Sequence, residues 1–536
     1  MKRIISLILI LILSLLLPSC ATPEPEKETY LVTFNPDNGD IPTSISVEEG
    51  ELVPRPTTPV KEGFDFVGWY VGEEEWLFDA SAVVKNTLIS AKWREKTPIV
   101  PDGGNGSDSG DTEKDDNEDK KEDGNTEITV IPDGGLDTSV NVTIKLYHTI
   151  NQYYRPALEA AIAEFESDYP SIDVIAEFCG SGQYVAERAM IEIEGENEGA
   201  VAFAFAEHLG RIYGAGLSQS MDVFINHEEM GLAENTFIES AVEEGKSFGD
   251  GKTHFLPIGQ NCDLLFYNNT FFEKYSLSVP ETMEELVEVC EAIKSIDPRI
   301  IPLGIDSASN LYLNLLAQST GEASPHLASA PETLKMLREL YTKGWVTTSD
   351  IEEQYMSALF GTSCPMSISS PSSARYMFSN DFDTGIAPIP QLYDNEAIVF
   401  RGTGFMPIKS KDPNVSVATW LLIKHLTTSS EFTFEYCKGN SVIPTDKSII
   451  SGKYLDHLFV GLLVPETAPD AYASYVMLEE SLPYAVFSKP NPYGADTHTT
   501  LSELVYNVMM YDGTDVDAYI TDQLALCHEK LKKQDN

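Results

Sequence analysis

The stretch HFLPIGQNCDLLFYNNTFFEKYSL, residues 254–277, decides how the chain is interpreted. It reads as a short apolar strand over 255–258, a polar bend over 259–263, a second strand over 264–267 and then a helical turn. This order predicts a chain that leaves one globular body at a polar crossing and enters a second body. A cleft between two bodies is a common place for a ligand to bind. An ordinary β-bend inside one large domain is the alternative.

The composition limits the classes of function. The chain has 536 residues, which is room for several domains. It carries 84 acidic against 36 basic side chains, a formal net charge of −48. So acidic a chain is expected to repel nucleic acid and anionic lipid surfaces. The charge favours a soluble surface that is exposed outside the cell.

The first 20 residues have the pattern of a secretion signal. Lys2 and Arg3 precede an apolar run over 4–17, which is too short for an ordinary membrane span. The sequence LPSC at residues 17–20 resembles the lipobox of bacterial lipoproteins, with a plain cleaved signal as the alternative. The resemblance implies lipidation of Cys20 and attachment to a bacterial membrane, at the cell surface or in the periplasm.

Six further cysteines are widely spaced, without a CxxC pair or a Cys/His cluster at metal-ligand spacing. The sequence therefore predicts no metal site. Their even number permits disulfides that the sequence cannot pair, and scattered buried thiols fit as well. These cysteines are Cys179, Cys262, Cys290, Cys364, Cys437 and Cys527.

Residues 29–94 predict a small β-rich module. The segments YLVTFNPDNG, FDFVGWYVG and TLISAKW read as short aromatic strands with turns between them. They resemble the internalin-type B-repeat, also called the Listeria–Bacteroides repeat, which implies a β-grasp-like module used on bacterial surface proteins. Trp69, Trp76 and Trp93 are expected in its core, because so small a module needs large side chains inside.

Residues 95–139 differ in kind from their neighbours. The segment is rich in Gly, Ser and acidic residues and has no apolar periodicity. This composition predicts a disordered, self-repelling linker.

Residues 140–536 alternate strands with helices. We expect strands at 142–148, 172–178 and 201–206, and an amphipathic helix at 156–169. Strand–helix–strand order with apolar strands predicts an α/β fold. Roughly four hundred residues are too many for one core, so two lobes are expected.

Four segments of this part occur in an order typical of one family. They are DVIAEFCGSGQYV (173–185), GKTHFLPIGQNCDLLFYNNTFFEKYSLSVPETMEEL (251–286), ALFGTSCPMSISSPSSARYM (358–377) and ATWLLIKHLTTSSEFTFEYCKGNSVIPT (418–445). Together they resemble the extracellular solute-binding proteins of ABC importers. The resemblance implies a two-lobed periplasmic-binding-protein-like (type II) domain with a multi-strand hinge, closing on a ligand.

Within that family, the layout is most similar to the glycerol-3-phosphate-binding branch. The resemblance implies that Tyr184, Glu207 and Ser370 contact the ligand, together with Gly402 before the returning strand. Asn261 stands where that branch has a serine in the polar crossing.

Two positions depart from the branch. Val442 stands near the place of its tyrosine, and Pro492 near the place of the arginine that pairs with phosphate. Phosphate sites normally use Arg or Lys side chains or a helix N-terminus. The departures therefore favour a neutral polyol or saccharide over a glycerol phosphate.

Sugar sites combine planar polar groups, which bind hydroxyls, with aromatic faces, which cover C–H surfaces. Asp263 lies two residues beyond Asn261 and is a further candidate for the polar set. The aromatic candidates are Tyr184, Tyr376, Phe405 and Tyr493.

No motif indicates an enzyme, since the chain lacks a GxSxG elbow, an HExxH pair and a Walker loop. We predict a lipid-anchored extracytoplasmic protein that captures a carbohydrate, polyol or related small solute and delivers it to the permease subunits of an ABC importer. It is expected to act as a monomer without a cofactor. The alternative is a surface adhesin or sensor lipoprotein that uses the B-repeat and a retuned binding domain.

Overall fold

The computed structural model describes residues 29–36, 43–48 and shorter stretches up to 95, then 131, 135–191, 198–450, 469–493 and 497–532, with single gaps at 327, 380 and 429. The chain divides into two compact units, Met1–Glu118 and Asp119–Asn536. The predicted signal segment with Cys20 lies outside the described residues, as does the predicted linker up to residue 130.

The first unit is a five-stranded sheet in the order β2-β1-β5-β3-β4. Its strands are β1 (Thr29–Asn35), β2 (Thr43–Glu48), β3 (Phe64–Val71), β4 (Glu74–Glu75) and β5 (Thr87–Glu95). The pair β1–β5 is parallel and the other pairs are antiparallel. Trp69 is buried against Phe34, and Trp76 and Trp93 pack at the edge of the same core. The expected core role is confirmed for Trp69, whereas Trp76 and Trp93 are partly buried against that core.

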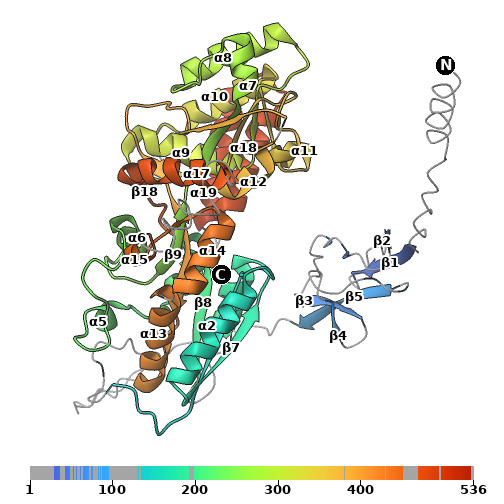
Figure 1. Cartoon of the computed structure of the whole chain (residues 1–536). Helices are drawn as coiled ribbons and strands as arrows, with labels where there is room; N and C mark the ends of the chain where they lie inside the picture. Colours follow the sequence, from blue (N-terminus) through green and yellow to red (C-terminus); the bar gives the residue numbers. More distant parts are fainter. Residues whose placement is uncertain are drawn as a thin grey trace, which may run out of the picture. The chain divides into compact units, whose positions relative to one another are not determined.

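The second unit contains two lobes, each built around its own sheet (Figure 1). The first lobe has a six-stranded sheet in the order β17-β9-β16-β8-β6-β7. Its strands are β6 (Val142–His148), β7 (Ile172–Phe178), β8 (Glu198–Phe205), β9 (Leu256–Asn261), β16 (Arg401–Pro407) and β17 (Ile443–Pro444). Strand β6 is parallel to β7 and β8, whereas β16 is antiparallel to both of its neighbours.

Helices cover both faces of the first-lobe sheet. They are α2 (Arg155–Asp168), α3 (Gly182–Ile191), η1 (Ala206–Leu209), α4 (Gly210–Gly214), α5 (Asp222–Ile225), α6 (Glu239–Gly245), α13 (Pro413–Thr428), α14 (Ser430–Asn440) and α15 (Lys447–Ile449). One face packs on α2 and α13 through Phe165, Phe203 and Trp420. The other face packs on α3 through Tyr147 and Val185. The strands are apolar because both of their faces are buried.

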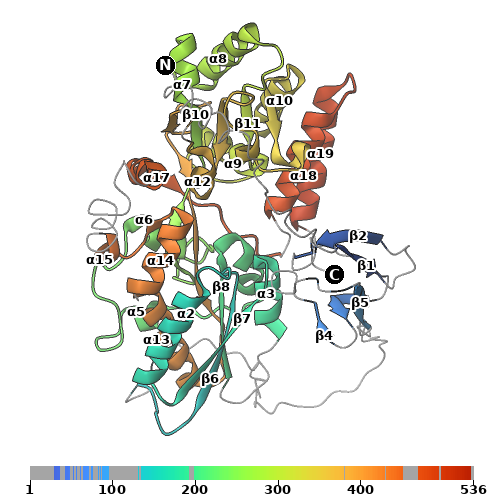
Figure 2. The same cartoon turned by 45° about the vertical axis from the view of Figure 1, so that its right-hand side comes forward.

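The second lobe has a five-stranded sheet in the order β12-β11-β13-β10-β14. Its strands are β10 (Leu264–Asn268), β11 (Leu303–Ile305), β12 (Val346–Thr348), β13 (Met366–Ser369) and β14 (Thr384–Ala387). Its larger helices are α7 (Asn269–Tyr275), α8 (Met283–Ile296), α9 (Ala308–Thr320), α10 (Ala330–Thr342), α18 (Thr497–Met510) and α19 (Val516–Lys532). Figure 2 shows α18 and α19 side by side at the edge of this lobe, where they pack with α10.

Shorter elements complete the second lobe and the region between the lobes. They are α11 (Ser349–Glu352), η2 (Met356–Ala358), η3 (Pro371–Ser373), α12 (Ala374–Met377), β15 (Ile398–Val399), α17 (Pro469–Ser481), η5 (Leu482–Tyr484) and β18 (Ala485–Val486). Strands β15 and β18 form a small parallel pair.

The crossing predicted from residues 254–277 is confirmed, because β9 belongs to one sheet and β10 to the other. The chain returns to the first lobe between β15 and β16. After β18 it enters the second lobe once more, where it forms α18. The bend is shorter than predicted, since β9 extends to Asn261 and only Cys262 and Asp263 separate the strands. Residues 259–261 are extended because they pair with β16 and β17, two strands that lie far away in the sequence.

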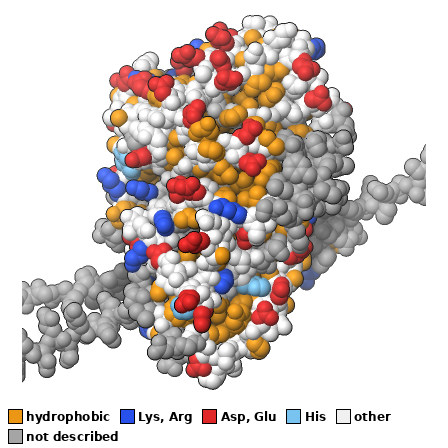
Figure 3. All heavy atoms as spheres, turned by 60° about the vertical axis from the view of Figure 1, so that its left-hand side comes forward, with side chains coloured by type: hydrophobic (Ala, Val, Ile, Leu, Met, Phe, Trp, Pro, Cys, Tyr) orange, Lys and Arg blue, Asp and Glu red, His pale blue; other side chains and the backbone are white. Residues whose placement is uncertain are grey.

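Cys262, Cys290, Cys364, Cys437 and Cys527 are buried free thiols. In the part of the chain that the structure describes, no helix has the length and apolar character to cross a membrane. Acidic side chains are spread from one end to the other of the face shown in Figure 3, as the net charge leads one to expect.

Candidate ligand-binding site

A cavity of about 410 Å³ opens where the chain crosses between the lobes. Its size falls in the range of about 300–1,000 Å³ that is typical of small-molecule sites. Most of its lining side chains carry a hydroxyl, an amide or an aromatic ring. The lining residues are Thr149, Asn151, Phe205, Gly259, Asn261, Ser370, Ser372, Arg401, Thr403, Tyr436, Asn440 and Val442.

Two neighbouring strands form the floor of the cavity. In β9 and β16, Asn261 pairs with Arg401, and Gly259 pairs with Thr403. All four residues line the cavity, because alternate residues of a strand share a face. The residues between them, Gln260 and Gly402, therefore face the opposite side of the sheet.

One wall of the cavity lies beyond the carboxyl ends of the parallel strands. Thr149 and Asn151 follow β6, and Phe205 is the last residue of β8. Ligands of open α/β sheets bind outside this edge, where loops can turn polar side chains toward a shared space. The position of the cavity is therefore the one that the sheet topology favours.

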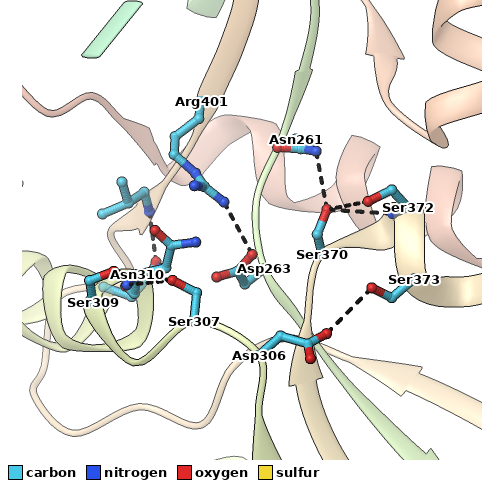
Figure 4. Close-up of polar contacts among 12 residues, drawn as sticks. Asn261, Asp263, Asp306, Ser307, Ser309, Asn310, Ser370, Ser372, Ser373 and Arg401 are labelled. Atoms are coloured by element: carbon cyan, nitrogen blue, oxygen red, sulfur yellow. Dashed lines mark hydrogen bonds and ion pairs between the residues drawn. The ribbon is translucent and has the colours of Figure 1, made fainter. Parts of the chain in front are cut away.

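Asn261 of the first lobe meets Ser370 of the second. The Asn261 Nδ2 atom lies 3.4 Å from Ser370 Oγ, and Figure 4 shows the two side chains pointing toward each other. Ser370 caps η3, and its Oγ accepts a hydrogen bond from the Ser372 backbone N–H at 3.4 Å. Among the described residues, Asn261 Oδ1 has no hydrogen-bond donor although it is buried. A buried amide oxygen in this position is ready to accept a hydrogen bond from a ligand hydroxyl.

Asp306 holds the turn that carries Ser370. Its Oδ2 atom accepts a hydrogen bond from Ser373 Oγ at 3.4 Å (Figure 4). Its Oδ1 atom accepts one from the Met356 backbone N–H at 2.7 Å. These bonds tie η3 to the body of the second lobe. The serines at the cavity thus occupy a fixed turn.

Arg401 and Asp263 form an ion pair beside the cavity. The Arg401 Nη2 atom lies 3.3 Å from Asp263 Oδ1, and the Asp263 side chain is only 4% exposed. Burial raises the pKa of Asp263, and the charge of Arg401 opposes that rise. The Arg401 guanidinium also lies 5.8 Å from the centre of the Phe205 ring. Of the described lining residues, Arg401 is the sole cation, and Asp263 balances its charge.

Glu244 of α6 lies on the opposite side of the floor. Its Oε1 atom accepts a hydrogen bond from the Gly402 backbone N–H, and its Oε2 atom accepts one from Gln260 Nε2, both at 2.6 Å. Burial raises the pKa of Glu244 to about 7, and the nearby charge of Glu207 adds to the rise. A carboxyl that titrates near neutral pH thus contacts both floor strands.

The structure brings Asn261 and Ser370 together at the cavity, and Asp263 lies directly behind Arg401. Tyr184 is half-buried in α3, and Glu207 is half-buried in η1, directly after β8. Neither residue lines the cavity, although both follow the carboxyl ends of parallel strands.

Gly402 also lies outside the cavity, on the side of Glu244. Tyr493 lines a different cavity of about 640 Å³, together with Arg211, Tyr213 and Lys409. The suggestion that Phe405 offers an aromatic face to a ligand is wrong. Its side chain is fully buried in the first-lobe core, with its ring centre 4.6 Å from that of Phe203.

Sequence reasoning missed Arg401, Thr149, Asn151, Tyr436 and Asn440. Arg401 directly precedes Gly402, which the sequence did single out, and a cation at the start of a returning strand is the signal that could have found it. The other four follow strands or lie in α14, and nothing in their local sequence marks them. In the described part of the chain, no group of His, Cys, Asp or Glu is arranged to hold a metal ion.

Most of the second unit matches a known protein family. Residues 160–455 match the family described as bacterial extracellular solute-binding protein. This match covers more than half of the chain.

Solved structures share the two-lobed fold at low sequence identity. The GacH receptor of Streptomyces glaucescens, solved unliganded and with acarbose, is 16% identical, with a TM-score of 0.55 over 74% of this chain and 99% of that one. UgpB of Mycobacterium tuberculosis, solved with glycerophosphocholine, is 16% identical, with a TM-score of 0.56 over 73% and 98% of the chains. An ABC substrate-binding protein of Listeria monocytogenes, solved with cycloalternan, is 15% identical, with a TM-score of 0.56 over 74% and 100%. Identities this low establish the fold alone.

The first unit has different relatives. Residues 30–92 match the Listeria-Bacteroides repeat domain. Internalin H of Listeria monocytogenes is 40% identical over 58 residues, which are 10% of this chain and 10% of internalin H. A protein of Evansella cellulosilytica is 35% identical over 71 residues, 13% of this chain and 11% of that protein. The chain thus spans about a tenth of the length of the curated relatives that it matches.

Proposed function

Because this chain belongs to the bacterial extracellular solute-binding proteins, we propose that it captures a neutral, hydroxyl-rich solute, a carbohydrate or a polyol, in the cavity between its lobes. In this proposal it hands the solute to the permease subunits of an ABC importer. It acts as a monomer that is held outside the cytoplasm by a lipid on Cys20, and it catalyses no reaction.

The observation that carries the proposal is the buried Oδ1 atom of Asn261, which has no donor among the residues that the structure describes. A buried acceptor without a donor costs about 1–3 kcal/mol, which a hydroxyl of a bound solute would relieve. The surrounding hydroxyl and amide groups offer further donors and acceptors. A carbohydrate or polyol presents several such hydroxyls at once.

The charge balance of the site supports a neutral solute. An anionic solute would need an unbalanced cation, but the Arg401 charge is balanced by Asp263 at 3.3 Å. Glu207 adds negative charge close to Glu244 and the same strands. Arg401 then acts as a hydrogen-bond donor to a hydroxyl rather than as the partner of a phosphate.

The capture mechanism follows from the two lobes. A solute that bonds to Asn261 and to Ser370 touches both lobes at once. It therefore stabilises the closed arrangement more than the open one. The closed form is the species that we expect the permease to recognise.

A thermal-shift screen of the whole chain against sugars, polyols, glycerol phosphate and glycerophosphocholine tests this function. A solute that binds only the folded protein raises its melting temperature by mass action. We expect a shift with at least one neutral carbohydrate or polyol, and a smaller shift with the anions. If every small solute leaves the melting temperature unchanged, the proposed function is wrong.

A second candidate function is favoured by the match of residues 30–92 to a repeat that also occurs in internalin H. In this case the first unit binds a surface partner and the protein acts as an adhesin or sensor. Binding of cell-wall or host material that is lost on deletion of residues 29–94, in a protein that gives no thermal shift with solutes, would support it over import.

A further inference from the structure

Glu244 is hydrogen-bonded to both floor strands of the cavity, on the face of the sheet that is opposite to the cavity. It is 3% exposed and lies in α6, which packs against β9 and β16. Its two oxygens accept hydrogen bonds at 2.6 Å, one from the Gly402 backbone and one from Gln260 Nε2. Gln260 in turn accepts a hydrogen bond from Ser240 Oγ at 2.7 Å.

The residues that Glu244 holds alternate with the residues that line the cavity. Gln260 precedes Asn261, and Gly402 follows Arg401. In a pleated strand, fixing one residue also fixes its neighbour on the opposite face. The carboxyl of Glu244 therefore helps to fix the backbone positions from which the Asn261 and Arg401 side chains extend into the cavity.

The charges that face Glu244 are few. Among the described residues, no Lys, Arg or His forms an ion pair with it. The facing charges are Arg401 on β16 and Glu207 in η1. His254, at the start of the β9 segment, bonds instead to Asp250 and Ser218 through its ring nitrogens.

We propose that Glu244 is a positioning residue of the ligand cavity, and that the gain or loss of its proton changes how strongly Arg401 and Asn261 hold a solute. The effect on solute binding rests on the proposed function. The coupling of Glu244 to Arg401 and Asn261 does not, because it needs no solute. Glu244 touches no solute and acts only through its two strand partners.

The hydrogen-bond network accommodates both protonation states. When the carboxylate takes up a proton, its Oε2–H group can donate to Gln260 Oε1 after the Gln260 amide turns over. The released Gln260 Nε2 group then donates to Ser240 Oγ, and the Gly402 N–H keeps its acceptor on Glu244. The number of hydrogen bonds in the network stays the same, with the Glu244–Gln260 and Gln260–Ser240 bonds reversed in direction, so the main consequence of protonation is the loss of one negative charge near Arg401.

The direction of the effect follows from that charge. The neutral form of Glu244 leaves the Arg401 guanidinium with less opposing charge, which makes it a stronger donor to a solute oxygen. We therefore expect solute affinity to rise as the pH falls through the titration of Glu244. Couplings between linked sites are typically about fivefold or more, and we expect a change of that size. Burial, which raises the pKa of Glu244 to about 7, places this change near neutral pH.

Isotope-labelled NMR on the whole chain tests the coupling without any solute. The signals of the Gly402 amide, the Asn261 side-chain amide and the Arg401 Nε–H group are followed from about pH 5 to pH 9. We expect all three to move with one shared midpoint in the wild-type protein and to lose that midpoint in Glu244→Gln. Glu243→Gln, an exposed neighbour on α6, is the matched control and is expected to keep the midpoint.

Two outcomes overturn the inference. One is that the three wild-type signals stay in place across the titration, a result that does not depend on whether a variant folds. The other is that the midpoint persists in Glu244→Gln. If the signals titrate together but no solute binds at any pH, the coupling stands and the proposed function is contradicted instead.

Discussion

The Asn261 amide of the first lobe lies 3.4 Å from the Ser370 hydroxyl of the second, and the two side chains meet at the edge of one cavity. The contact is long for a hydrogen bond between side chains, and Asn261 Oδ1 has no donor among the described residues. A solute hydroxyl beside the two groups would supply the donor that Asn261 Oδ1 lacks and could also bond to Ser370 Oγ. The contact between the lobes is thus also the point at which a ligand would join them.

Replacing Asn261 by alanine is expected to weaken solute binding about 5- to 150-fold, because it removes a buried amide that bonds to the solute, an effect of about 1–3 kcal/mol. Isothermal titration calorimetry measures the change. Asn226→Ala is the matched control, since Asn226 is exposed next to α5 and away from the cavity. Equal affinities of Asn261→Ala and the wild-type protein would remove Asn261 from the site.

Replacing Asp263 by asparagine is expected to shift selectivity toward anionic solutes. The change leaves Arg401 without its balancing carboxylate at 3.3 Å. The affinity for glycerol phosphate, relative to a neutral sugar, should rise about fivefold or more. Asp297→Asn breaks the exposed pair with Arg299 in the second lobe and is expected to leave selectivity unchanged. If Asp263→Asn also leaves the relative affinities unchanged, Arg401 does not face the solute.

Replacing Gly402 by alanine is expected to destabilise the protein. A Cβ atom would lie 2.3 Å from Glu244 Oε2 and 2.7 Å from Pro257 Cβ, closer than real contacts allow. We expect denaturant unfolding to show a loss of about 1–3 kcal/mol, as for other overpacked sites. In a Glu244→Ala background the loss should shrink, because one of the colliding groups is gone.

The Gly402→Ala protein also separates two roles for this residue. The family resemblance implies that Gly402 contacts the ligand, whereas its position in the structure is against Glu244. A variant with wild-type stability and no solute binding would favour direct contact.

Glu244 gives the stability of the protein a pH dependence of known sign. Its pKa is raised in the folded state from 4.5 to about 7 by burial, so its contribution is most favourable below about pH 4.5, where both states are protonated. As the pH rises through about 7, that contribution is lost, because the unfolded chain releases the proton more readily. A shift of this size corresponds to about 3 kcal/mol.

Denaturant unfolding at about pH 5 and pH 8 measures this term as the difference between the wild-type protein and Glu244→Gln. The wild-type protein is expected to lose more stability than the variant on going to the higher pH. Glu243→Gln is expected to behave like the wild-type protein. Identical pH dependence in Glu244→Gln would show that this carboxyl does not titrate in the range.

The two-lobed fold could be predicted because its strong signals are local. The helix expected at 156–169 is observed as α2, with Leu158, Ala161, Ile162 and Phe165 buried on one face. The crossing was visible because residues 255–258 and 264–267 are apolar on both sides of a polar break. Its length was not visible, since the pairing partners of residues 259–261 lie in β16 and β17.

The candidate site could be predicted only in part, for the same reason. Asn261 and Ser370 were singled out through the family resemblance, which implies that both contact the ligand, and the structure brings them together. Arg401 lines the cavity because it pairs with Asn261 on the neighbouring strand, and Phe405 lies in the core because it packs on Phe203. Both contacts join residues that are far apart in the sequence. Tyr493 lines a different cavity, which no local pattern indicates.

A calorimetric double-mutant cycle on Asn261 and Ser370 shows whether one solute binds to both lobes at the crossing. Binding of a neutral carbohydrate or polyol identified by the thermal-shift screen is measured in the wild-type protein, Asn261→Ala, Ser370→Ala and the double variant. We expect one binding site, a loss of affinity in each single variant, and a double-variant loss smaller than the sum, because one solute joins both side chains. Wild-type affinity in both single variants would contradict capture of the solute between the two lobes at this crossing.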